Sequence, residues 1–239
     1  MKALPSLALA AALVAALAGT AHAQVRITEV APWSSGQAPI SADWFELTNF
    51  GSTAVNLTGW KMDDDSYAAA TAFALNGVTT LAAGASAVFI EGTAATAATF
   101  VSAWFPGGVP AGFQIGYYSG SGVGLGTGGD GVSVFDASNV LQAIVRFGAS
   151  PTASPYATFD NAAGLDAGAP IFPVANMPIT ISTLSIAGVN GAFQTSYGTI
   201  SAIGSPGSVA AVPEPETWAF LLAGLAASGG LARRRRKAA

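Results

Sequence analysis

The stretch Asp43–Asn49 (DWFELTN) decides the fold class, because its side chains alternate in a way that suits a β-strand. Phe45 and Leu47 would face one side of the strand, whereas Trp44 and Glu46 would face the other. Both sides carry large side chains, which is typical of a strand covered on two faces. We therefore expect Trp44 and Phe45 to lie on opposite faces of a buried sheet.

Short runs of this kind recur on both sides of Asp43–Asn49, separated by Gly, Asn, Asp and Pro. Strands this short at this spacing predict an all-β sandwich or barrel. Asp136–Asn139 predicts a hairpin turn, because Asp opens type I turns and Asn tolerates the left-handed conformation that closes them. Ala94–Ala103 is a weak candidate for a helix. The candidate strands are Val25–Val30, Trp44–Asn49, Ala54–Leu57, Trp60–Met62, Ala85–Ile90, Phe113–Tyr118, Val132–Phe135, Val140–Phe147, Thr180–Ile186 and Ser196–Ile200.

Several of these runs together resemble the lamin-tail domain family. The segments that carry the resemblance are, in chain order, Val25–Val30 (VRITEV), Asp43–Asn49 (DWFELTN), Val55–Met62 (VNLTGWKM), Leu81–Gly84 (LAAG), Gly129–Val132 (GDGV) and Ile203–Gly207 (IGSPG). The resemblance covers about Val25–Gly207 and implies an immunoglobulin-like β-sandwich. Thr28 stands where the family often has Asn.

Composition excludes several classes of function. The chain of 239 residues contains no Cys, and its single His is His22, which we expect to be removed with a signal peptide. Ser-His-Asp and Cys-His catalysis and the usual zinc ligand sets are therefore excluded for the mature chain. Residues 24–211 carry three basic and eleven acidic residues, a net charge of −8. A body this acidic repels phosphate backbones, so we expect no nucleic-acid partner.

The N-terminal residues 1–23 have the features of a secretory signal peptide. Lys2 supplies positive charge, Leu7–Ala18 is an unbroken apolar run, and Ala21 and Ala23 form a small-x-small cleavage site before Gln24. We expect export from the cytoplasm.

The C-terminal residues 212–239 combine three elements. Pro213, Glu214 and Pro215 precede the apolar run Trp218–Ala232, which would form a single hydrophobic helix. The run has 15 residues, about 22 Å of helix, so it spans a bilayer only if the flanking arginines snorkel. The cations that follow would stay in the cytoplasm by the positive-inside rule; they are Arg233, Arg234, Arg235, Arg236 and Lys237.

All three elements resemble the PEP-CTERM sorting signal of exopolysaccharide-producing Gram-negative bacteria. The resemblance covers Val212–Lys237 and implies that an exosortase recognises and processes the tail. The precursor would be tethered transiently to the inner membrane and then sorted to the cell surface or extracellular matrix. The domain boundaries expected are residues 1–23 (signal peptide), 24–211 (sandwich) and 212–239 (sorting and anchor segment). Within the sandwich, residues 149–178 would form a Pro-rich surface excursion.

The densest acidic cluster is Asp63–Ser66, which follows the candidate strand Trp60–Met62. Three carboxylates offer oxygen ligands for Ca²⁺, yet consecutive side chains diverge and the EF-hand spacing is absent. A solvated turn is the simpler interpretation, and no other cofactor is expected. The Gly124, Gly126 and Gly129 pattern matches a dinucleotide fingerprint in letters only, because a strand and not a helix follows it.

Two acidic pairs, Glu29 with Glu46 and Asp130 with Asp136, have the composition that glycoside hydrolysis needs. We expect Glu46 to be structural, accepting hydrogen bonds or pairing with a cation such as Lys61 or Arg26 if it is buried. Trp60 is expected to anchor the core.

Three hypotheses follow. The first is a non-enzymatic surface or matrix module that is structural or adhesive, with exopolysaccharide as a candidate partner. The second is a calcium-dependent carbohydrate-binding sandwich that uses the Asp63–Asp65 turn with Tyr117, Tyr118 or Trp104. The third is a secreted carboxylate-based glycoside hydrolase.

Overall fold

The computed structural model describes residues 25–33, 42–120, 122–161 and 179–208. The expected signal peptide and the C-terminal segment, with Pro213–Pro215 and Arg233–Lys237, lie outside these residues. No helix within the described residues has both the length and the apolar character needed to cross a membrane.

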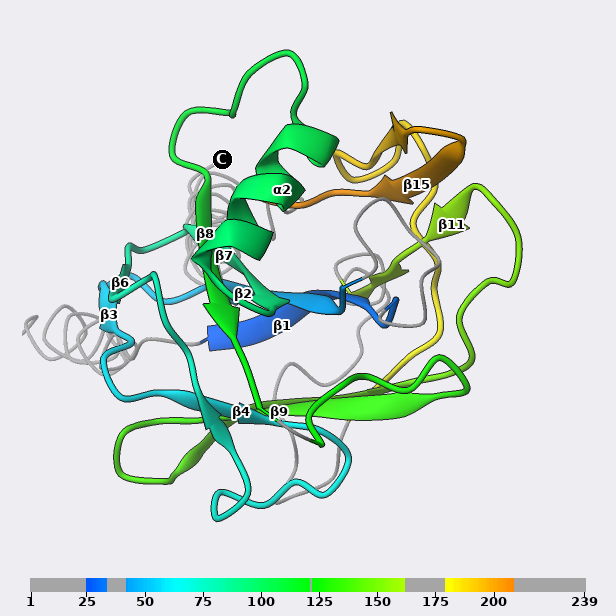
Figure 1. Ribbon diagram of the computed structural model, residues 1–239. Coiled ribbons are helices and arrows are strands. Elements are labelled where there is room, and N and C mark those ends of the chain that lie inside the picture. Colours follow the sequence, from blue (N-terminus) through cyan, green and yellow to red (C-terminus); the bar gives the residue numbers. More distant parts are fainter. Residues whose placement is uncertain (1–24, 34–41, 121, 162–178, 209–239) are drawn as a thin grey trace, which may run out of the picture. The chain divides into compact units, whose positions relative to one another are not determined.

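Two five-stranded sheets form most of the structure (Figure 1). The first has the order β12-β1-β2-β7-β8, with bounds Phe159–Asp160, Val25–Ala31, Trp44–Asn49, Ser86–Glu91 and Gln114–Tyr118. The second has the order β13-β10-β9-β4-β5, with bounds Ile179–Ile181, Leu141–Phe147, Asp130–Phe135, Lys61–Asp63 and Phe73–Ala74. Two smaller sheets are β11-β15-β14 (Tyr156–Ala157, Ile200–Gly204, Phe193–Tyr197) and β3-β6 (Val55–Asn56, Thr80–Leu81).

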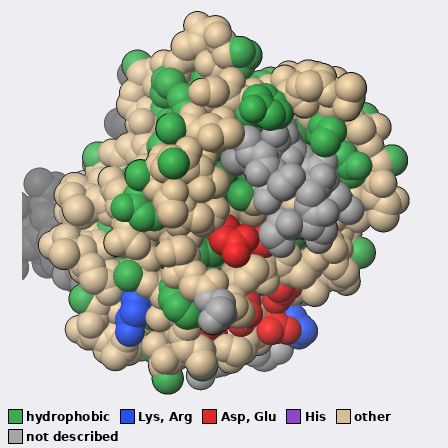
Figure 2. Space-filling model, viewed as in Figure 1, with side chains coloured by type: hydrophobic (Ala, Val, Ile, Leu, Met, Phe, Trp, Pro, Cys, Tyr) green, Lys and Arg blue, Asp and Glu red, His purple; other side chains and the backbone are tan. Residues whose placement is uncertain are grey.

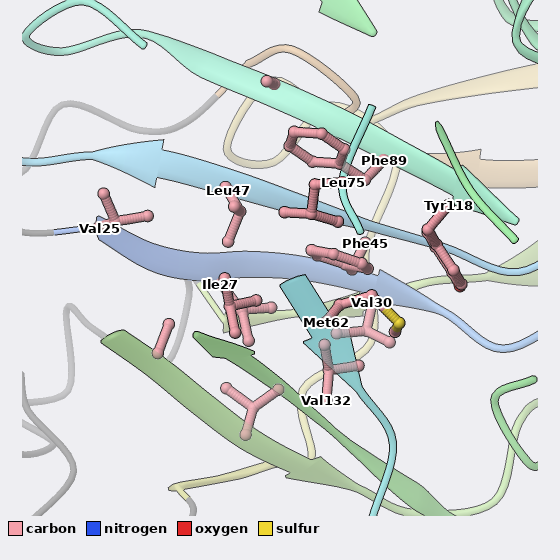
Figure 3. Packing of buried hydrophobic residues seen from close by; sticks show 14 of the residues in the cluster. Val25, Ile27, Val30, Phe45, Leu47, Met62, Leu75, Phe89, Tyr118 and Val132 are labelled. Atoms are coloured by element: carbon pink, nitrogen blue, oxygen red, sulfur yellow. The ribbon is translucent and has the colours of Figure 1, made fainter. Parts of the chain in front are cut away.

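The main core lies between the two five-stranded sheets. Ile27, Phe45 and Leu47 of the first sheet belong to the same buried cluster as Met62 and Val132 of the second. Figure 3 shows these side chains extending from facing strands into one apolar layer. This arrangement is a β-sandwich, as the alternation in Asp43–Asn49 predicts.

The opposite face of the first sheet is covered as well. Helix α2 (Ala94–Trp104) and the β11-β15-β14 sheet contribute to a second buried cluster, in which Trp44, Val88 and Ile90 meet Phe100 and Trp104. Figure 1 shows α2 on the side of β2 and β7 that faces away from β4 and β9. Every residue of β2 is buried as a result. Trp44 and Phe45 do lie on opposite faces of a doubly covered strand.

Helix α2 begins with a capping box. The Thr93 hydroxyl accepts a hydrogen bond from the Ala95 N–H, and Thr96 accepts one from the Thr93 N–H. These bonds satisfy N–H groups that a helix start leaves without partners. The helix expected at Ala94–Ala103 is therefore present, and it extends one residue further, to Trp104.

Most candidate strands are confirmed with small shifts at their ends, and two are not. Ser196–Ile200 is wrong as one strand, because the chain reverses there between β14 and β15, with Gly198 at φ +63°. The strand expected at Thr180–Ile186 ends at Ile181 in β13. The hairpin turn at Asp136–Asn139 is confirmed: Asn139 has φ +63°, and its N–H donates to the Asp136 carbonyl at 2.9 Å.

The expected Pro-rich excursion is described only in residues 149–161. These residues supply β11, which pairs with β15, and β12, which pairs with β1 at the edge of the first sheet. Phe159 is buried and packs against Phe147 with ring centroids 5.4 Å apart. Residues 162–178 lie outside the described residues, so the remainder of the excursion stays a prediction.

Candidate functional site

The acidic turn Asp63–Ser66 is organised around one buried carboxylate. Asp63 ends β4, is 1% exposed, and accepts hydrogen bonds from the Ser66 hydroxyl, the Ala68 N–H (2.7 Å) and the Thr71 hydroxyl (3.0 Å). Asp65 is exposed, and burial together with the neighbouring acidic groups raises the pKa of Asp64. Asp63 is therefore engaged in holding its own turn, whereas Asp64 and Asp65 are more exposed.

A surface hollow of about 470 Å³ adjoins this turn. It is lined by polar groups and one aromatic ring, among them Asp64, Asp65, Ser66, Phe73 and Gly122. Within the described residues, no group of three His, Cys, Asp or Glu side chains is arranged to hold a metal ion. The described residues therefore contain no preformed metal site, although the hollow is large enough for a small polar ligand.

A second acidic cluster forms on the outer face of the first sheet. Glu29 of β1 lies directly opposite Glu46 of β2 in the strand register and opposite Asp160 of β12 on its other side. All three side chains are at most 3% exposed. We call Glu46, Glu29 and Asp160 the carboxyl row.

The two glutamates of the carboxyl row accept hydrogen bonds from other parts of the chain. Glu29 accepts from the Thr158 hydroxyl, the Ser205 N–H (2.9 Å) and the Ser205 hydroxyl (3.0 Å). Glu46 accepts from the Thr28 hydroxyl (2.7 Å) and from the Gly207 N–H. Glu46 was expected either to accept hydrogen bonds or to pair with a cation such as Lys61, and these contacts are hydrogen bonds. They are consistent with the structural role expected of Glu46.

Burial shifts the pKa values of both glutamates upward. Loss of water is the main cause at Glu29, whose pKa rises to about 8, and the negative charges of Glu46 and Asp160 add to the effect. Loss of water also raises the pKa of Glu46 to about 7, with Asp160 adding to it. Hydrogen bonds to both groups act in the opposite direction but do not outweigh burial.

Neither acidic pair has the arrangement that glycoside hydrolysis needs. Asp130 begins β9 and Asp136 follows its last residue, so about 20 Å of extended strand separates them, well beyond the roughly 5–10 Å between catalytic carboxyl groups. Glu29 and Glu46 are adjacent, but each is only 1% exposed and its oxygen atoms accept hydrogen bonds from the protein itself. A sugar chain has no access to either carboxyl group.

The glycine pattern ends at a strand, as the sequence indicates. β9 begins at Asp130, directly after Gly129, so no helix start is present to receive a pyrophosphate group. The Asp130 carboxylate accepts hydrogen bonds from the N–H groups of Gly126 and Gly131, which closes the loop.

The aromatic residues are mostly structural. Trp60 is 6% exposed in the main core, as expected. Trp104 and Tyr118 are 1% and 0% exposed, so the proposal that they present carbohydrate-binding surfaces is wrong. Trp104 instead stacks on Trp33 with ring centroids 6.2 Å apart, and Trp44 meets both rings edge-on.

Sequence reasoning missed the aromatic cluster under α2, although a signal for it exists. The buried residues of this helix are Ala97, Phe100, Ala103 and Trp104. Their spacing places them on one helical face, which is the pattern of a helix packed against a core. Reading that spacing would have placed Trp104 in the interior.

The fold defines an all-β sandwich domain, and the buried carboxyl groups of Glu29, Glu46 and Asp63 accept hydrogen bonds from the domain itself. A family model for the Lamin Tail Domain matches residues 18–149, and the chain belongs to this family of immunoglobulin-like domains. The match ends before residues 150–207, which the sequence resemblance had included. No curated protein matches the chain.

A second family model, for the PEP-CTERM protein-sorting motif, matches residues 211–237. This motif indicates an exported protein that an exosortase processes and sorts to the cell surface. The two matched families are structural and sorting domains and not families of enzymes. The matched range includes Pro213–Pro215 and Arg233–Lys237.

Proposed function

We propose that the chain is a non-enzymatic module of the cell surface or extracellular matrix, with a structural or adhesive role. One observation carries this proposal: β15, the last strand within the described residues, ends at Gly204, and the matched sorting motif begins at residue 211. The sandwich is thus joined to its sorting signal by only a few residues. We infer that the folded domain is the cargo that the signal delivers.

The weakly charged surface supports this role. Five of the ten acidic residues of the body that the structure describes are buried, namely Glu29, Asp43, Glu46, Asp63 and Asp160. Figure 2 shows a face with few charged side chains apart from a group of acidic ones beside a basic one. A surface of this kind meets neutral polymers through hydroxyl and amide hydrogen bonds with little electrostatic repulsion. Exopolysaccharide is therefore the partner that we propose for it.

We assign the sorting steps to individual residues. A signal peptidase would cut after Ala23, with Ala21 as the other small residue of its site. The exosortase would recognise Pro213, Glu214 and Pro215. The cations Arg233–Lys237 would hold the apolar tail in the inner membrane with its basic end in the cytoplasm. The helix formed by the tail would be transient.

Intact-mass measurement of the surface-extracted protein tests this proposal. We expect the mass of a chain that begins at Gln24 and ends near Pro213–Glu216. A variant with Pro213, Glu214 and Pro215 all replaced by Ala should retain the tail and stay with the membrane, whereas the control Glu216→Ala should be processed normally. A full-length tail on the surface-extracted wild-type protein would contradict sorting by cleavage.

A calcium-dependent carbohydrate-binding module is the second candidate, and the polar hollow beside Phe73 is the observation that favours it. Calcium at about 100 times its Kd should raise the stability by about 2.7 kcal/mol if a site exists. Asp64→Asn with Asp65→Asn should abolish this shift in Tm, and Asp136→Asn serves as the control outside the hollow. A Tm that calcium and sugars leave unchanged excludes this candidate.

A further inference from the structure

Glu46, Glu29 and Asp160 place three carboxyl groups side by side on adjacent strands. The register pairs Glu29 with Glu46 on one side and with Asp160 on the other. Side chains in such directly opposed positions lie about 5 Å apart at Cβ, where like charges repel. All three are buried, so water does not screen this repulsion.

One short segment covers the row and donates to it. The N–H and the hydroxyl of Ser205 bond to Glu29, and the N–H of Gly207 bonds to Glu46. Gly204, just before this segment, lies so close that a Cβ there would be 2.7 Å from Glu29 Oε1. We call Ser205–Gly207 the strap; it follows β15 and precedes the matched sorting motif.

Two chains of hydroxyl groups connect the glutamates to their surroundings. Thr28 donates to Glu46, so Thr48 must donate to Thr28 (2.9 Å) and Ser86 to Thr48 (2.6 Å). Ser86 is partly exposed. In the same way, Thr158 donates to Glu29, so Ser185 must donate to Thr158 (2.6 Å). The first chain ends at a partly exposed hydroxyl and gives protons a route to Glu46, whereas Ser185 at the end of the second chain is itself buried.

Few other ionisable groups come from the elements packed on the row. Helix α2, β15 and the strap contain no ionisable side chain, and β11 and β14 contribute only Tyr156 and Tyr197. Arg26 shares β1 with Glu29 and lies over the Phe50 ring, 4.6 Å from its centroid. The charges that act on Glu29 and raise its pKa are those of Glu46 and Asp160.

We propose that the carboxyl row is a proton-operated latch that holds the strap, and with it the junction between the sandwich and the sorting tail. When the glutamates are protonated, the row is neutral enough to stay buried and the strap is closed. When both ionise, each carboxylate gains by meeting water and moving away from its neighbour, which favours lifting of the strap. The raised pKa values of Glu29 and Glu46 show that burial and repulsion outweigh the hydrogen bonds that the strap donates.

This latch goes beyond the proposed surface role and does not depend on it. An exported protein meets the pH of its surroundings, so the junction next to the sorting motif would respond to that pH. Opening between about pH 6 and about pH 9 would release Ser205 and Gly207 of the strap from the carboxyl row.

The test is an NMR titration of the full chain in detergent from about pH 5 to about pH 9. We expect the side-chain carboxyl ¹³C signals of Glu29 and Glu46 to titrate well above the ordinary glutamate pKa of about 4.3. The amide signals of Ser205 and Gly207 should move with the same midpoints. Protease cleavage near the strap, corrected for the pH dependence of the protease, should rise about tenfold over this range.

Two variants separate the latch from a general effect of pH. Glu29→Gln should remove the pH-dependent step at Ser205 while Glu46 still titrates, because Gln keeps the acceptor and donor sites but carries no charge. Glu91→Gln, at the end of β7 and outside the row, should behave as wild type. The proposal would be overturned if both glutamates of the wild-type chain titrated with ordinary midpoints, or if the strap amides did not respond to pH. Both measurements use the wild-type chain, so they decide the question even if the Gln variant fails to fold.

Discussion

The two faces of the first sheet bury their residues in different ways. On the inner face, Ile27, Phe45 and Leu47 meet an apolar layer from the second sheet. On the outer face, the same two strands present Glu29 and Glu46 together with Trp44. Burial is equally complete on both faces, since all of these residues are at most 1% exposed. The inner face is therefore stabilised by apolar contact, whereas the outer face combines an apolar cluster with carboxyl groups that depend on hydrogen bonds and on protonation.

This difference has a physical consequence. Apolar burial contributes about 25 cal/mol per Å² and does not change with proton concentration. A buried carboxyl group contributes according to its charge state, because transfer of the ionised form out of water is costly. We expect the stability of the inner face to be independent of pH and that of the outer face to fall as pH rises.

The largest effect is expected from Phe45→Ala, which leaves a cavity in the inner core. Phe45 is fully buried and stacks with Phe89 at a centroid distance of 5.8 Å. Loss of a buried Phe typically costs about 3–5 kcal/mol. Urea unfolding at about pH 5.5 and about pH 8.5 should give the same loss at both values. A loss that depends on pH would show that the two faces are coupled.

Glu29→Gln should have the next largest effect, and it should be stabilising at high pH. The pKa of Glu29 is raised to about 8 in the folded chain and is near 4.3 when unfolded, so the folded state binds the proton more tightly. The stability of the wild type is therefore fully present below about pH 4.3 and is lost as pH rises to about 8. Gln cannot ionise, so we expect the variant to be about 2–4 kcal/mol more stable than wild type at pH 8.5.

The control for this measurement is Glu91→Gln, which should follow the wild-type pH profile. Glu29→Gln should approach the stability of the wild type at low pH, where Glu29 is protonated in the folded state and increasingly so in the unfolded state. If the stability of the wild type instead rose between pH 5 and pH 8 in parallel with that of Glu29→Gln, a raised pKa of Glu29 would be ruled out.

Gly204→Ala should destabilise the outer face by steric crowding. A Cβ at this position would lie 2.7 Å from Glu29 Oε1 and 3.0 Å from both Thr158 and Trp104. Overpacking of this kind costs about 1–3 kcal/mol. Gly128→Ala is the matched control, because a Cβ there meets no atom within 4 Å. The Tm values of the two variants should differ by several degrees. Equal Tm values would show that the side chains around position 204 move to accommodate a Cβ without loss of stability.

The inner face could be predicted from the sequence, because its signal is local. Alternation in residues 43–49 places Phe45 and Leu47 on one side, and β2 has the bounds expected. The Asn139 turn is equally local, since one left-handed residue closes it. Short-range patterns of this kind carry enough information to place a strand or a turn.

The outer face could not be predicted, because its contacts join positions far apart in the chain. Glu29 meets Ser205 across 176 positions, and Glu46 meets Gly207 across 161. The pairing of Glu29 with Glu46 also depends on an irregularity in the β1–β2 register between Ile27 and Glu29. A shift of one residue would have turned either side chain to the other face. No property of Ser205 or Gly207 in the sequence indicates a carboxylate partner.

Ser205→Ala should have the smallest effect, and its pH dependence distinguishes the two charge states of Glu29. The variant loses the hydroxyl that bonds to Glu29 Oε2 but keeps the N–H that bonds to Oε1. A hydrogen bond to a neutral group contributes about 1 kcal/mol and one to a charged group about 1.5–3 kcal/mol. We therefore expect a loss of about 1 kcal/mol at pH 5.5, where the strap is closed, and a smaller loss at pH 8.5, where the strap lifts and the bond is broken. A larger loss at pH 8.5 would mean that the strap stays bonded to the charged group. The loss is measured by urea unfolding, with Ser208→Ala as the control beyond the strap. If the loss were the same at both values, Glu29 would keep one charge state across this range and the pH dependence of the outer face would have to arise at Glu46.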